Sequence, residues 1–177
     1  MKVVLTAINA KYIHSNLAVY SLRAYAKQYA DEIRIAEYTI NQQPDDILMD
    51  LYRKKPDVLC FSCYIWNLSF VEALVREIKK LLPETAIWVG GPEVSYDARE
   101  VLERLPQLTG VVKGEGEETF LELMQHYHQE KELATIEGIT YRNEAGEVCE
   151  NQWRQVIDLS AVPFVYEDLE QFQNKII

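Results

Sequence analysis

The sequence has few of the residues on which several protein classes depend. Cysteine occurs only three times in 177 residues, at positions 60, 63 and 149, an odd and sparse set that argues against a disulfide framework. No apolar run approaches the roughly 20 residues of a membrane-spanning helix. Residues 1–10 also lack the apolar core and cleavage site of a signal peptide. We therefore expect a cytoplasmic protein that does not bind a membrane.

Basic residues are also scarce relative to acidic ones. The chain has 18 lysines and arginines against 28 aspartates and glutamates, which gives a formal net charge of −10. Because a phosphate backbone would on average be repelled by this surface, nucleic acid is not an expected partner. What the chain does have is hydrophobic residues, 48% of the total, enough for one domain with a small appendage.

Two of the cysteines, Cys60 and Cys63, have CxxC spacing within an apolar run at 57–66. In a strand, alternate side chains point to opposite faces, so positions three apart do not meet. We therefore expect two small buried side chains rather than a metal or redox pair.

The distribution of apolar and β-branched residues predicts an α/β fold. Five short runs are each followed by a helical pattern: 2–9, 32–40, 57–64, 86–91 and 110–114. Alternation of this kind indicates a parallel sheet with helices on both faces. The second run alternates like an edge strand, whereas the first and third are almost continuously apolar. We predict a doubly wound, flavodoxin-like (Rossmann-like) sheet of five parallel strands in the order 2-1-3-4-5.

The pattern changes after residue 134. Residues 135–152 are predicted to form a β-hairpin with its turn between Asn143 and Gly146. Residues 153–177 have little periodicity and contain Pro163, as expected of a linker. The predicted organisation is an α/β domain over 1–134, a hairpin and a linker.

The fold class directs attention to the loops that follow the strands. In such sheets ligands bind beyond the carboxyl ends of the strands, here near the switch point between the first and third. A phosphoacceptor domain would need carboxylates after these two strands, but the sequence has Asn9 and Ser62 there. Only Lys113, at the end of the fifth strand, matches that class.

Nucleotide-binding classes fit the loops poorly. The loop at 9–16 has one serine and no glycine, unlike the phosphate loop of a flavodoxin. The string 114-GEGEET-119 lacks the third glycine of a dinucleotide fingerprint, and its three glutamates would repel a pyrophosphate. It is better explained as a tight turn whose Glu117 and Glu118 stabilise the start of a helix.

The remaining loops predict a broad opening. Gly90 and Gly91 would let a ligand approach the backbone, and Tyr64 and Trp66 could line the rim. A flat, largely apolar ligand would suit this arrangement.

Two strings resemble a known family. Residues 89-VGGPEVSYDAREVL-102 and 110-GVVKGEGEETFLEL-123 resemble the cobalamin-binding domain that precedes the catalytic half of cobalamin-dependent radical SAM enzymes. Residues 136–148 and 157–169 are similar to the hairpin and linker that lead into the radical SAM barrel. The resemblance covers nearly the whole chain and implies cobalamin, with its corrin ring over the carboxyl edge of the sheet and its nucleotide tail directed toward the core.

The resemblance also implies site residues. The loop at 12–16 would approach the lower face of the corrin, Ser62 and Cys63 would meet the tail, and 90–92 and 114–116 would line the cofactor. With the neighbouring loop positions, the candidate cofactor-binding residues are Tyr12, Ile13, His14, Ser15, Asn16, Ser62, Cys63, Tyr64, Trp66, Asn67, Gly90, Gly91, Pro92, Glu93, Gly114, Glu115 and Gly116. No catalytic or metal-ligating residue is assigned.

Two departures from related families qualify these expectations. Mutase-type cobalamin domains carry DxHxxG, but His14 has neither an Asp two residues before it nor a Gly three residues after it, which favours His-off binding. The chain also lacks the CxxxCxxC motif of a radical SAM cluster. S-adenosylmethionine and a [4Fe–4S] cluster would therefore belong to a C-terminal radical SAM domain outside this chain. This chain would be a fragment without catalysis of its own.

The leading hypothesis is a module that holds cobalamin for a methyl-transfer-type reaction. Two alternatives stay open: an interaction domain in which Tyr64 and Trp66 fill a degenerate site, and a flavin or nucleotide binder. A homodimer that buries the exposed surface is also open.

Overall fold

The computed structural model describes residues 1–11, 15–156, 158, 160, 162, 163 and 165. Its strands are β1 (Val3–Asn9), β2 (Ile33–Thr39), β3 (Val58–Ser62), β4 (Ala86–Gly90), β5 (Gly110–Val112), β6 (Ile139–Arg142) and β7 (Val148–Glu150). Its helices are α1 (Leu17–Tyr25), α2 (Pro44–Lys54), α3 (Leu68–Leu81), α4 (Pro92–Ser95), α5 (Ala98–Arg104) and α6 (Glu117–Tyr127). Short 3₁₀ turns lie at Lys27–Tyr29 and Leu133–Thr135.

The strands form one sheet in the order β2-β1-β3-β4-β5-β6-β7. The first five pair in parallel, which confirms the predicted order 2-1-3-4-5. The predicted hairpin is also present as β6 and β7, but it extends the sheet because β6 pairs antiparallel with β5. This continuation was not predicted from the sequence.

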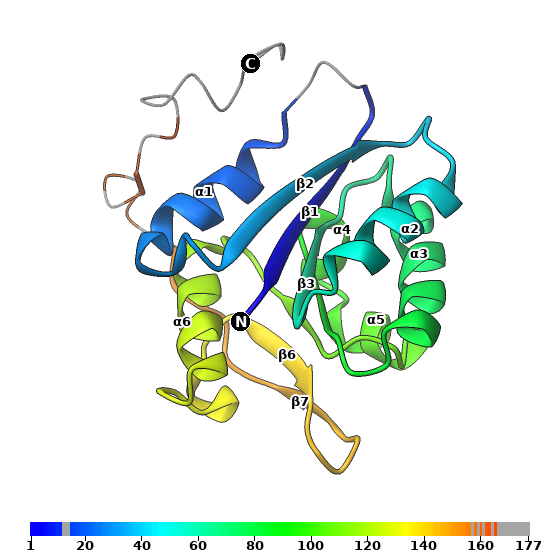
Figure 1. Ribbon diagram of the computed structural model, residues 1–177. Helices are drawn as coiled ribbons and strands as arrows, with labels where there is room; N and C mark the ends of the chain where they lie inside the picture. The colour runs from blue at the N-terminus through cyan, green and yellow to red at the C-terminus, as the bar shows by residue number, and fades with distance from the viewer. Residues whose placement is uncertain (12–14, 157, 159, 161, 164, 166–177) are drawn as a thin grey trace.

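Helices cover both faces of the sheet (Figure 1). On one face α1 and α6 pack with Val3, Leu5 and Ala7 of β1. On the other face α2, α3 and α5 pack with Val4 and Ile8 of the same strand. Because β1 is buried on both sides, its sequence is almost continuously apolar, as expected of a central strand.

The two cysteines of the CxxC string lie on opposite faces, as strand alternation predicted. Cys60 packs against the α1 and α6 side, whereas Cys63 belongs to the core on the other side. Burial raises the pKa of each thiol to about 12, and Glu72 and Glu93 add to the effect at Cys63. At neutral pH both thiols are therefore protonated, which is the form that neither binds a metal nor attacks an electrophile.

Local sequence explains the helix that follows β2. Pro44 occupies the first turn of α2, where its missing N–H has no intrahelical partner to lose. Lys55 ends that helix in the left-handed conformation, and its N–H bonds to the Leu51 carbonyl. Within the described part of the chain, no helix has both the length and the apolar character needed to cross a bilayer.

Candidate functional site

A cavity of about 410 Å³, which we call the inner cavity, opens at the carboxyl ends of the parallel strands. It lies between the sheet and helices α1 and α6. Its lining residues are Leu5, Ala18, Val19, Leu22, Cys60, Phe61, Ser62, Tyr64, Trp88, Val89, Gly90, Gly91, Pro92, Ser95, Tyr96, Val112, Gly114, Glu115, Gly116, Glu117 and Phe120.

Strand register gives the depth of the inner cavity. Ser62 and Gly90 are paired at the edge of the sheet, whereas Cys60 and Trp88 are paired two residues deeper, beside Leu5. Two residues of strand span about 7 Å. The cavity therefore extends from the sheet edge into the core of the α1 and α6 side.

Trp88 forms the floor of the inner cavity and is held in one orientation. It is 1% exposed, and its Nε1 donates to the hydroxyl of Tyr127 at 2.7 Å. Its ring lies over Gly110, where a Cβ would stand 2.2 Å from a ring carbon. The absence of a side chain at Gly110 thus makes room for the indole.

The two glycines at the end of β4 have different roles. Gly91 has a φ of +113°, and a Cβ there would lie 2.4 Å from the carbonyl oxygen of Cys63, so the backbone itself requires glycine. A Cβ at Gly90 would meet Val112 at an ordinary 3.4 Å. Gly90 is therefore the glycine that leaves space at the mouth of the inner cavity.

The turn between β5 and α6 forms another part of the mouth. Gly114 has a φ of +67°, and Glu117 and Glu118 lie in the first turn of α6, which confirms the predicted strand-to-helix turn. The hydroxyl of Ser95 donates to the Gly91 carbonyl at 2.8 Å and accepts from the Gly114 N–H at 3.1 Å. Ser95 thereby links this turn to the end of β4.

A polar network fixes the start of α1 beside the site. The side-chain oxygen of Asn16 caps the helix by accepting from the Ala18 N–H at 3.2 Å, and its Nδ2 donates to Ser62 Oγ at 3.2 Å. The carboxylate of Glu37 accepts from the Asn16 N–H and from the hydroxyl of Tyr20, which lies in α1. Asn16 is therefore a positioning residue for the helix that walls the cavity.

Asn67 connects β1 to the loop after β3. This side chain is fully buried, and its Nδ2 donates to the carbonyls of Ile8 and Ser62 at 2.9 Å each. Its Oδ1 accepts from the Tyr64 N–H at 2.8 Å. The described hydrogen bonds use both the Nδ2 and the Oδ1 of Asn67. This side chain therefore holds the loop after β3 in its conformation.

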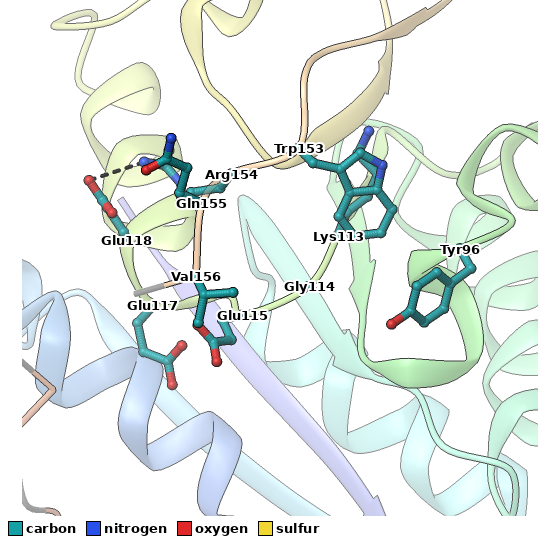
Figure 2. Close-up of a pocket in the computed structure, with 10 residues that line it drawn as sticks. All are labelled: Tyr96, Lys113, Gly114, Glu115, Glu117, Glu118, Trp153, Arg154, Gln155 and Val156. Carbon is teal, nitrogen blue, oxygen red and sulfur yellow. Dashed lines mark ion pairs between the residues drawn. The ribbon is translucent and has the colours of Figure 1, made fainter. Parts of the chain in front are cut away.

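A second cavity of about 520 Å³, the outer cavity, adjoins the first (Figure 2). The two cavities share Tyr96, Gly114, Glu115 and Glu117. Residues 153–156, which we call the strap, border the outer cavity, and Figure 2 shows the strap crossing near the β5–α6 turn.

Two cations attach the strap and hairpin to the rest of the fold. Lys113 is 2% exposed, and its Nζ donates to Glu150 at 3.1 Å and to the Asn151 carbonyl at 2.8 Å. Arg154 pairs with Glu118 at 3.0 Å and also with Glu122. The hairpin therefore contributes to the frame of the site.

Large apolar side chains are exposed around the two cavities. Tyr64 and Trp66 stack with ring centroids 4.6 Å apart, and Tyr96 and Trp153 lie 5.6 Å apart. We call the following set the apolar rim: Ile65, Trp66, Tyr96, Trp153 and Val156, which are between 46% and 84% exposed. Exposed apolar groups gathered beside cavities are typical of a surface that binds a ligand or another domain.

The model of the B12 binding domain family matches residues 3–124, which is more than half of the chain. The chain belongs to the B12-binding domain family. The family match covers every strand that borders the inner cavity, all of α1 and residues 117–124 of α6.

Two curated relatives and one solved structure are similar to the chain. It is 29% identical over 127 residues to the cobalamin-dependent radical SAM methyltransferase TokK of Streptomyces tokunonensis, which covers 68% of the chain and 18% of TokK. It is 30% identical over 110 residues to the hopanoid C-3 methylase of Methylococcus capsulatus, which covers 61% of the chain and 21% of that protein. The chain thus spans about a fifth of these relatives.

The similar solved structure is that of the cobalamin-dependent S-adenosylmethionine radical enzyme OxsB with aqua-cobalamin and S-adenosylmethionine bound. The TM-score is 0.75 at 22% identity, over 96% of this chain and 25% of OxsB. At this identity the similarity shows that the two chains share a fold.

The predicted site residues of this B12-binding domain separate into three groups. Those that line the inner cavity are Ser62, Tyr64, Gly90, Gly91, Pro92, Gly114, Glu115 and Gly116. Those outside its lining are Ser15, Asn16, Cys63, Trp66, Asn67 and Glu93. Tyr12, Ile13 and His14 lie outside the described residues.

Sequence reasoning missed the deep part of the cavity. Leu5, Leu22, Trp88 and Phe120 line it, but none was a candidate. Their only sequence feature is the apolar periodicity of strands and helices, and that pattern predicts core packing equally well.

Proposed function

We propose that this domain binds cobalamin at the inner cavity, with the nucleotide tail in the cavity and the corrin ring over the carboxyl edge of the sheet. The observation that supports this most directly is a hollow of about 410 Å³ within the region that matches the B12-binding family. The hollow opens at the edge where the fold class predicts ligands.

The residues of the inner cavity suit such a cofactor. Below the sheet edge the walls are apolar, as a flat aromatic base requires, whereas the mouth carries backbone polar groups and the side chains of Ser62, Glu115 and Glu117. Cobalamin has the same division, because its corrin is surrounded by amide groups and its tail ends in an apolar base. Gly90 adds room at the boundary between the two regions.

The cofactor-free alternative required Tyr64 and Trp66 to fill the opening. Tyr64 lines the cavity without closing it, and Trp66 stacks on Tyr64 with 46% of its surface exposed. This arrangement favours the binding hypothesis over an interaction domain with a degenerate site.

We further propose that this chain is the cofactor-carrying part of a longer protein whose C-terminal radical SAM domain holds S-adenosylmethionine and a [4Fe–4S] cluster. The names of its relatives and its coverage of only about a fifth of their length support this proposal. In that setting, bound cobalamin would carry a methyl group from S-adenosylmethionine to the substrate. The apolar rim is the surface that the second domain would cover.

The experiment is retention of cobalamin on gel filtration. The 177-residue chain is mixed with hydroxocobalamin or methylcobalamin, free ligand is removed, and the ultraviolet–visible spectrum of the protein peak is recorded. We expect a retained corrin with a base-off spectrum, and the same spectrum in His14→Ala, because binding is proposed to be His-off. A spectrum of nitrogen-ligated cobalt that is lost in His14→Ala would refute the His-off proposal.

A pair of variants links retention to the inner cavity. Ala18→Leu adds three carbons to a residue that lines the cavity, and we expect it to weaken binding at least about tenfold by filling the tail space. Ala73→Leu makes the same change on the exposed face of α3 and should bind like the unchanged chain. Equal affinity in both variants, or no retention by the unchanged chain, would overturn the assignment.

A further inference from the structure

We propose that the inner cavity selects among cobamides by the polarity of their lower base. It accepts apolar bases such as benzimidazoles and phenols and discriminates against purines. This inference rests on the proposed function and adds to it the class of cofactor that the site takes.

The selection follows from the polar groups that the cavity offers below the sheet edge. Among the described lining residues, the deep part is formed by Leu5, Val19, Leu22 and Phe120, with Cys60 and Trp88, whereas the apolar Val112 is paired with Gly90 at the sheet edge. The indole N–H already donates to Tyr127 at 2.7 Å, so it has no second proton to give. Burial keeps the Cys60 thiol protonated, and a thiol is a weak hydrogen-bonding group.

The polar side chains of the cavity lie nearer its mouth. Ser95 donates to the Gly91 carbonyl and accepts from the Gly114 N–H, and Ser62 accepts from Asn16 at the sheet edge. A base that lies at the level of Cys60 and Trp88, about two strand residues below this edge, is therefore too deep to form hydrogen bonds with Ser62 or Ser95.

The chemistry of the bases then decides which is accepted. Adenine carries an exocyclic amino group and additional ring nitrogens on the edge where dimethylbenzimidazole carries carbon and methyl groups. Burying such groups without partners costs about the equivalent of a tenfold to hundredfold loss of affinity. A phenolic base likewise presents an apolar ring and avoids this loss.

The floor cannot readily adapt to a purine. The Trp88 ring is bonded at its nitrogen and packed on Gly110, so rotation would break the bond to Tyr127 and leave a buried N–H unsatisfied. The selectivity thus depends on a Trp88 ring whose orientation is fixed by these two contacts.

The experiment compares dissociation constants of four pure corrinoids for the 177-residue chain by isothermal titration calorimetry. The ligands are cobalamin, p-cresolylcobamide, adenylcobamide and cobinamide, which has no nucleotide. The phenolic base does not coordinate cobalt and adenine coordinates it only weakly, so release of the base from cobalt contributes least to the difference between p-cresolylcobamide and adenylcobamide. We expect the phenolic cobamide to bind about tenfold to hundredfold more tightly than the adenyl form.

A matched pair of variants tests the cause. Leu22→Gln places an amide of similar size in the wall and should narrow the difference between the two cobamides. Leu22→Met keeps the wall apolar and should preserve the difference in affinity between the two cobamides. Retained discrimination in Leu22→Gln would contradict the polarity explanation.

The outcomes separate this inference from the proposed function. Equal affinity for adenylcobamide and p-cresolylcobamide would overturn the selectivity while leaving cobalamin binding intact. Equal affinity for cobinamide and cobalamin would show that the tail does not occupy the cavity. Binding of none of the four would overturn both proposals.

Discussion

Replacement of Gly91 by alanine should destabilise the fold at the edge that carries the site. Gly91 follows β4 with a φ of +113°, and the added Cβ would lie 2.4 Å from the carbonyl oxygen of Cys63 and 3.1 Å from its nitrogen. These are backbone atoms at the end of β3, so relief requires the two strand ends to separate. The Cys63 N–H donates to the Gly90 carbonyl at 2.7 Å, and that bond lies in the same region.

The magnitude has two parts. A non-glycine residue in this backbone conformation costs about 1–2 kcal/mol. The steric contact adds about 1–3 kcal/mol, as overpacking does elsewhere in cores. Gly146→Ala is the matched control, because Gly146 has a φ of +83° but no atom within 4 Å of the added Cβ. We expect Gly91→Ala to lose about 2–5 kcal/mol and Gly146→Ala only about 1–2 kcal/mol.

Urea denaturation of the three proteins measures these losses as differences in the free energy of unfolding. Cobalamin affinity, measured under native conditions, should fall for Gly91→Ala and stay unchanged for Gly146→Ala, because only the first residue lines the inner cavity. Equal stability losses in the two variants would refute the close approach of β4 and β3.

Three further predictions concern buried polar and thiol groups. Asn67→Ala should cost about 2–4 kcal/mol in urea denaturation, because it leaves the partly buried Tyr64 N–H and two carbonyls without their described partner. Lys113→Met should cost about 1–3 kcal/mol and speed amide hydrogen exchange at residues 151–156, because the charged anchor of that segment is lost. Ellman's reagent at pH 8 should modify Cys149 well before Cys60 and Cys63, whose pKa values of about 12 leave almost no thiolate.

Each of these predictions has a control and a contrary outcome. For the lysine, the control is Lys80→Met, which alters a 67%-exposed side chain and should leave hydrogen exchange unchanged. Unchanged amide hydrogen exchange at residues 151–156 in Lys113→Met would contradict the proposal that Lys113 holds this segment in place. A stability loss under about 1 kcal/mol in Asn67→Ala would contradict the hydrogen bonds of the Asn67 side chain. Rapid modification of all three thiols in the folded protein would contradict the raised pKa values of Cys60 and Cys63.

The order of the parallel strands could be predicted because local sequence carries it. Each strand is a short apolar run followed by a helical pattern, and the alternation in β2 distinguished an edge strand from the almost continuously apolar β1. The pairing of the hairpin with β5 could not be predicted in the same way. It depends on contacts between distant residues, such as the bond from the Lys113 N–H to the Gly138 carbonyl, and no local pattern specifies which sheet edge a hairpin joins.

The location of the site could be predicted better than its interior. Loops at strand ends are set by the fold class, and Ser62, Gly90 and Gly114 were found in this way. Leu22 and Phe120, which line the deep cavity, lie on helices whose apolar faces also form the core. Whether such a face packs against the sheet or leaves a hollow is decided by side-chain volumes across several elements.

The hairpin and the inner cavity are mechanically related through the β5–α6 turn. One side of that turn is held by Ser95, which bonds the Gly114 N–H, and the other side is held by Lys113, which bonds the end of the hairpin. The same turn borders both cavities. A change in the position of the strap would therefore act on the mouth of the inner cavity through a short path of described contacts. A domain that covers Trp153 and Val156 would contact the strap directly. Docking of that domain and the affinity of the inner cavity for its cofactor should therefore be coupled.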